Sequence, residues 1–196
     1  MLLGAGALAS VAFVLLASRV NGRETSHKDG RIRSRIPKRR RKATRSATTA
    51  LGWIGKRAFD FPAATGLALY THPRSRAGAA VILLSAPLAD GVSMLFERYM
   101  PHRAPPPGRH EPSNPSFPSG HSLRTTTLTL TTAYVLLRER HGSSAIIAPV
   151  AALVPLLTGA GRLYLDRHWG TDVVGGWLAG TALAALCAAG YELMED

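Results

Sequence analysis

The tetrapeptide Pro118-Ser119-Gly120-His121 stands at the start of an apolar segment, and a second polar group follows further along the chain. In that second group Arg162, His168 and Asp172 again lie between two apolar segments. Two histidines, an arginine, a small-residue turn and a carboxylate are the groups that phosphoryl transfer through a histidine requires. We therefore expect the rest of the chain to be a scaffold that brings these two groups together.

The apolar residues are concentrated in blocks, although they make up only 46% of the 196 residues. Several blocks approach the roughly 20 residues that a helix needs to cross a bilayer. The sequence therefore predicts an all-α integral membrane bundle of five to six transmembrane helices, with spans at 2–18, 78–97, 119–138, 144–161 and 172–190.

Residues 50–70 are ambiguous as a further span. Lys56, Arg57 and Asp60 fall in the middle of this segment, where each charge costs about 2.5–3.5 kcal/mol on a translocon scale. We expect an interfacial or poorly inserted helix here.

Polar and small residues inside the predicted spans are expected to serve helix packing. Asp90 interrupts the 78–97 span, and we expect its carboxylate to bond a neighbouring helix. The threonines of the 119–138 span can bond back to their own helix or across to another, and the small residues near Gly176 suit close helix packing.

Positive charge is concentrated in residues 21–49, which hold eleven Lys/Arg against Glu24 and Asp29, in a chain of net charge +12. We predict that residues 1–49 form an N-terminal membrane anchor and basic linker, and that 50–196 form the membrane domain, with its core at 78–190. A solvated linker against anionic lipid headgroups is expected. A nucleic-acid site is not, because no aromatic residue is interleaved with the basic ones.

Counting crossings after residue 78 places the polar groups at one membrane surface. The spans before and after the proline-rich loop 101–118 share one face, and the next two spans return the chain to that face at Arg162. The groups expected at this surface are Arg98, Arg103, His121, Arg162, His168 and Asp172.

These motifs resemble the type-2 phosphatidic acid phosphatase superfamily of membrane phosphatases. The second family motif, P-S-G-H, matches residues 118–121, and the third keeps its spacing at Arg162, His168 and Asp172. The first motif is degraded: Arg98 stands at the lysine position, Arg103 at an arginine position, and Ala104 replaces the proline. Gly161 also replaces the usual serine of the third motif.

The resemblance implies a lipid phosphatase in which His168 attacks phosphorus, Asp172 holds the other ring nitrogen of His168, and His121 protonates the leaving oxygen. It implies neither a metal nor a cofactor. Candidate substrates are phosphatidic acid, phosphatidylglycerol phosphate and polyprenyl-linked phosphates or pyrophosphates. The groups expected to bind phosphate are Arg162, Ser119, the backbone of Gly120, Arg98 and Arg103.

Two alternatives remain open at this point. Vanadate-dependent haloperoxidases resemble the same constellation, although the membrane blocks argue against them. A catalytically impaired membrane protein that binds anionic lipid or a partner would fit the degraded first motif.

The positive-inside rule gives the expected orientation. Arg74, Arg76, Arg138 and Arg140 lie on the face opposite the site, which predicts an active site on the extracytoplasmic side. A cytoplasmic basic segment is compatible with that orientation only if residues 50–70 do not cross.

Overall fold

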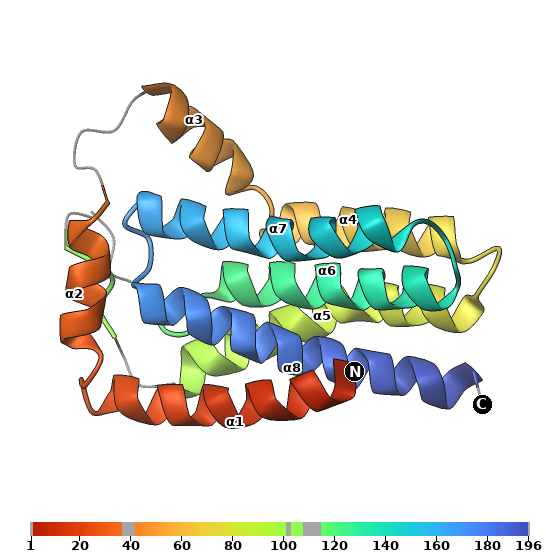
Figure 1. Cartoon of the computed structure of the whole chain (residues 1–196), viewed down its shortest axis with the longest axis horizontal. Helices are drawn as coiled ribbons and strands as arrows, with labels where there is room; N and C mark the ends of the chain where they lie inside the picture. Colours follow the sequence, from red (N-terminus) through yellow and green to blue (C-terminus); the bar gives the residue numbers. More distant parts are fainter. Residues whose placement is uncertain (1, 37–41, 101–102, 108–114, 196) are drawn as a thin grey trace.

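The computed structural model describes residues 2–36, 42–100, 103–107 and 115–195, and in these ranges it contains eight helices and no strand (Figure 1). This confirms the all-α prediction. The helices are α1 (Leu2–Asn21), α2 (Ser26–Ser34), α3 (Lys42–Leu51), α4 (Arg57–Thr71), α5 (Arg76–Tyr99), α6 (Gly120–Arg138), α7 (Ser144–Tyr164) and α8 (Gly170–Glu195).

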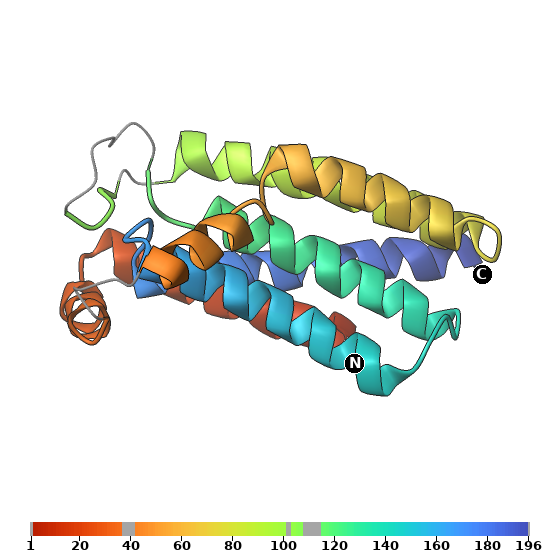
Figure 2. The same cartoon turned by 90° about the horizontal axis from the view of Figure 1, so that it is seen from above.

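The long helices form one bundle with α6 and α8 in contact at its centre (Figures 1 and 2). Among the described residues α1, α5, α7 and α8 are long and apolar enough to cross a membrane. The close approach of α8 to α6 requires glycine, because a Cβ atom on Gly176 would lie 2.5 Å from the carbonyl oxygen of Ser119. This confirms the packing role expected for the small residues of α8.

Some threonines of α6 bond back to their own helix, as expected for a helix in an apolar environment. Thr126 donates to the carbonyl of Ser122 at 2.7 Å, and Thr129 donates to that of Thr125 at 2.7 Å. These bonds satisfy two threonine hydroxyls without water, whereas the hydroxyls of Thr125 and Thr132 are buried with no hydrogen-bond partner among the described residues.

Helix α1 packs in the same bundle as the later helices. Phe13 stacks on Phe96 of α5 and on Phe117, with ring centroids 5.1 and 6.0 Å apart. The predicted division at residue 49 therefore does not coincide with a break in packing.

Residues 57–71, which include most of the ambiguous segment 50–70, form α4, a helix of 15 residues that packs along α5 (Figure 2) and is not among the described helices long and apolar enough to cross a membrane. Arg57 pairs with Asp90 at 2.7 Å, and the buried Asp60 accepts from the backbone N–H of Gly55 at 3.0 Å. Because these charges have partners, the helix avoids much of the cost that unpaired charges would carry. The same pair confirms that Asp90 bonds a neighbouring helix.

The crossing count is confirmed at one end of the bundle, which we call the motif end. Helices α5 and α7 finish there and α6 and α8 begin there, on the left of Figure 1. Helices α2 and α3 lie at the same end. Helix α4 reaches the opposite end, so α2, α3 and the motif residues share one end of the molecule.

Candidate active site

A backbone hydrogen bond joins the two sequence motifs. The N–H of Ser119 donates to the carbonyl of Asp172 at 2.9 Å, and the Ser119 hydroxyl, fully buried, accepts from the hydroxyl of Ser122 at 3.1 Å. The next position has no room for a side chain, because a Cβ atom on Gly120 would lie 2.4 Å from Oγ of Ser93. The start of α6 is thus held against the start of α8, and two positive helix ends meet.

His168 is held through its Nδ1 atom. This nitrogen lies 2.9 Å from the carbonyl oxygen of Ser116 and 3.7 Å from Oδ2 of Asp172. A carbonyl oxygen can only accept, so this hydrogen bond requires the proton on Nδ1 and leaves a lone pair on Nε2. The expected hydrogen bond from His168 to Asp172 is therefore replaced. The Ser116 carbonyl accepts the Nδ1 proton, and the Asp172 carboxylate lies 3.7 Å from the same nitrogen.

Asp172 is completely buried, with 0% of its surface exposed, and both carboxylate oxygens are occupied. Oδ2 accepts from the backbone N–H of Trp169 at 2.8 Å, and Oδ1 accepts from Nη1 of Arg103 at 2.8 Å. These bonds fix the carboxylate next to the imidazole of His168.

His121 and Arg162 form the second part of the site. Arg162 is only 6% exposed, and it acts electrostatically on His121, as do His168, Arg124 and Lys56. Within the described part of the chain, Nε2 of His121 and Nε of Arg162 are buried and have no hydrogen-bond partner. Two orphaned nitrogens in one cationic cluster are suited to an anionic ligand with several oxygen atoms.

The turn between α3 and α4 covers this cluster, which the sequence did not indicate. Gly55 has a φ angle of +89°, and a Cβ atom there would lie 2.9 Å from the carbonyl oxygen of His121. Arg124 Nε donates to the carbonyl of Gly55 at 2.9 Å and so anchors the turn. Lys56, the next residue, adds positive charge near His121. In the sequence, Gly52 and Gly55 beside Lys56 indicate a turn with a positive charge, but they do not specify which helix the turn contacts.

Helix α2 docks across the motif end, which corrects the expectation of a solvated linker for this part of 21–49. Arg33 bonds Asp166 at 3.2 Å and the carbonyl of Pro107 at 2.8 Å. Asp29 accepts from the backbone N–H of Thr171 at 3.0 Å. Residues 37–41, the central part of the basic run, lie outside the described residues.

The two arginines of the degraded first motif differ in position. Arg103 binds Asp172, Thr171 and Asp29 at the start of α8. Arg98 is exposed on the last turn of α5, with its guanidinium 5.6 Å from the ring centre of Tyr99. The structure thus brings Arg103 to the motif residues and places Arg98 on the surface.

Three comparisons with known proteins agree. The family model described as the PAP2 superfamily matches residues 63–193. The phosphatidylglycerophosphatase B of Bacillus subtilis strain 168 is 37% identical over 93 residues, which cover 45% of this chain and 43% of that protein. The alignment thus spans less than half of that relative. A crystal structure described as the first transmembrane PAP2 type phosphatidylglycerolphosphate phosphatase from Bacillus subtilis matches with a TM-score of 0.83 at 22% identity, covering 97% of each chain.

Proposed function

The chain belongs to the PAP2 superfamily, and from this premise we propose that it is an integral membrane phosphatase acting on a lipid phosphate. Phosphatidylglycerol phosphate is the substrate that we place first, because both relatives are named for that activity. The multi-pass membrane bundle supplies a site at the membrane surface, where a lipid headgroup lies.

The observation that carries the proposal is the pair of orphaned nitrogens. Nε2 of His121 and Nε of Arg162 are buried without a partner among the described residues. An unsatisfied buried donor costs about 1–3 kcal/mol, more when it is charged. A bound phosphoryl group would remove that cost, and the planar guanidinium is well shaped for its oxygens.

The geometry of His168 supports its role as nucleophile. With the proton on Nδ1 held by the Ser116 carbonyl at 2.9 Å, Nε2 has the lone pair for attack on phosphorus. The N–P bond forms as the bond from phosphorus to the lipid oxygen breaks, and His121, which takes up a proton when the anionic phosphoryl group binds beside it, donates that proton to the leaving oxygen. Water then attacks the phosphohistidine and gives a proton to His121, which releases phosphate and restores both histidines.

The remaining groups bind the charge that is transferred. Arg162 and the N-terminus of α6, with Ser119 and the backbone of Gly120, supply donors to the phosphoryl oxygens. No step in this scheme uses a metal ion.

The test is phosphate release from a panel of lipid phosphates in detergent with EDTA present. We expect wild-type protein to release phosphate, and His121→Ala and His168→Ala to lose nearly all activity, because each removes a reacting group. Folded wild-type protein that binds lipid phosphate but releases none would favour a binding protein instead. Wild-type activity in His168→Ala would overturn the nucleophile assignment.

For the membrane orientation we propose a motif end on the extracytoplasmic side. The support is the arginines at the turns of the opposite end, where Arg74 lies 3.1 Å from His141 and Arg138 and Arg140 are close by in sequence. This orientation also places α2 and α3 outside, so the positive-inside rule is met by the turns of the opposite end and not by the basic segment. There the exposed residues of α2, such as Lys28 and Arg31, would face anionic lipid headgroups.

A further inference from the structure

We propose that Asp29 of α2 is a positioning residue for the nucleophilic histidine, acting through Arg103 and Asp172. This inference rests on the proposed function, since it assigns a role in the same reaction. Asp29 lies ahead of residues 63–193, the part of the chain that matches the family model.

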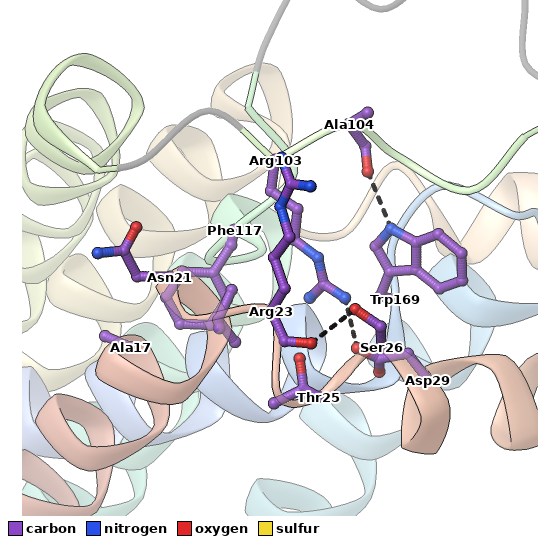
Figure 3. A pocket seen from close by; sticks show the side chains of 11 residues that line it. Ala17, Asn21, Arg23, Thr25, Ser26, Asp29, Arg103, Ala104, Phe117 and Trp169 are labelled. Atoms are coloured by element: carbon purple, nitrogen blue, oxygen red, sulfur yellow. Dashed lines mark hydrogen bonds and ion pairs between the residues drawn. The ribbon is translucent and has the colours of Figure 1, made fainter.

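Asp29 is bound as a structural carboxylate. It is only 1% exposed, and it accepts from the N–H of Thr171 at 3.0 Å, from the Thr171 hydroxyl at 2.7 Å and from Nη2 of Arg103. Thr171 lies in the first turn of α8, so these bonds join α2 to the helix that carries Asp172. Figure 3 shows the Asp29 carboxylate and the Arg103 guanidinium facing each other at one side of a pocket of about 470 Å³.

Arg103 bridges two carboxylates. Nη1 donates to Oδ1 of Asp172 at 2.8 Å and to the hydroxyl of Thr171 at 2.6 Å, while Nη2 binds Asp29. Its guanidinium also lies 5.4 Å from the ring centre of Trp169, whose Nε1 donates to the carbonyl of Ala104 at 2.9 Å. Because both N–H groups of Nη1 and one of Nη2 are bound to protein acceptors at the start of α8, Arg103 is placed to orient Asp172.

The connection ends at the reacting ring. Oδ2 of Asp172 lies 3.7 Å from Nδ1 of His168, and the same oxygen accepts from the N–H of Trp169, the next residue in the chain. A shift of Arg103 would therefore move the carboxylate relative to the imidazole. Loss of alignment at a reacting group lowers the rate of the chemical step more than it lowers substrate binding.

Helix α2 has a second attachment that does not involve Asp29. Arg33 binds Asp166 at 3.2 Å and the carbonyl of Pro107 at 2.8 Å. We therefore expect α2 to stay docked when the Asp29 charge is removed, so that a change in rate reports alignment.

The experiment compares Asp29→Asn with Glu24→Gln, which removes an exposed carboxylate from the same segment. With phosphatidylglycerol phosphate in detergent, or whichever lipid of the panel is cleaved, Asp29→Asn should lower kcat about 10- to 100-fold. KM should stay within about twofold, because no phosphate ligand is removed. Asp29→Glu should recover part of kcat, and Glu24→Gln should match wild type.

A double-mutant cycle tests the route. If Asp29 acts through Arg103, Asp29→Asn should have little further effect on kcat in an Arg103→Gln background. An equal loss in both backgrounds, or wild-type kcat in Asp29→Asn, would overturn the proposal. Wild-type protein without phosphatase activity would instead overturn the proposed function, so the two failures are distinct.

Thr171→Val is the second variant, for use if Asp29→Asn does not fold. It removes the hydroxyl that donates to Asp29 and accepts from Arg103 while leaving both charges in place. A lower kcat with unchanged KM would support the positioning role, and an unchanged kcat would overturn it.

Discussion

Replacing Asp172 by asparagine removes a negative charge from a buried side chain that accepts two hydrogen bonds. The side chain is fully buried, with Oδ2 2.8 Å from the N–H of Trp169 and Oδ1 2.8 Å from Nη1 of Arg103. Asparagine has nearly the same shape and can keep one of these bonds. The change therefore tests the charge more than the packing.

The expected loss of rate follows from the 3.7 Å between Oδ2 of Asp172 and Nδ1 of His168. Positive charge develops on the imidazole as Nε2 attacks phosphorus, and a carboxylate at about 4 Å stabilises it by about 4 kcal/mol at an effective dielectric constant of 20. The guanidinium of Arg103 cancels part of that attraction. We therefore expect a loss of about 2–4 kcal/mol in transition-state stabilisation, or roughly 30- to 1,000-fold in kcat.

The assay is steady-state phosphate release by Asp172→Asn in detergent, with the thermal midpoint measured on the same sample. Glu97→Gln, which removes an exposed carboxylate from the last turn of α5, is the control and should retain wild-type kcat. A folded Asp172→Asn protein with kcat within threefold of wild type would refute the electrostatic argument.

Two further predictions concern the cover of the site and its orientation. Gly52→Ala should raise KM severalfold, because its Cβ would lie 2.1 Å from Nη2 of Arg162 and would displace that flexible guanidinium; unchanged KM would show that the guanidinium position is unimportant. For orientation, the only native cysteine is removed by Cys187→Ala, and an impermeant thiol reagent is applied to intact cells. Arg167→Cys at the motif end should be labelled and Ser144→Cys at the opposite end protected, whereas the reverse pattern would place the motif end in the cytoplasm, with the basic segment.

Much of the architecture could be predicted because it depends on local composition. Apolar blocks of bilayer length predict helices wherever they occur. Their order fixes which ends coincide, so His121 and Arg162 could be assigned to one surface by counting crossings. The small residues of α8, such as Gly176, likewise predicted a close helix contact before its partner was known.

The course of residues 50–70 could not be predicted because it depends on pairing between distant charges. Arg57 and Asp60 count against a buried helix when they are considered alone. Asp90, far along the sequence, pairs with the half-exposed Arg57 at 2.7 Å, and the buried Asp60 accepts from the backbone N–H of Gly55. The cost of a buried charge depends on its three-dimensional partners, which hydropathy along the chain does not describe.

The sequence by itself determined the class of fold, the membrane setting and the identity of the motif residues, because each depends on the types of residues that lie close together in the chain. Only the tertiary structure decided which groups surround them. It placed the Ser116 carbonyl on His168, Arg103 on Asp172, and Asp29 on Arg103. These contacts join segments far apart in the chain, and their geometry is set by how the helices pack rather than by any local pattern.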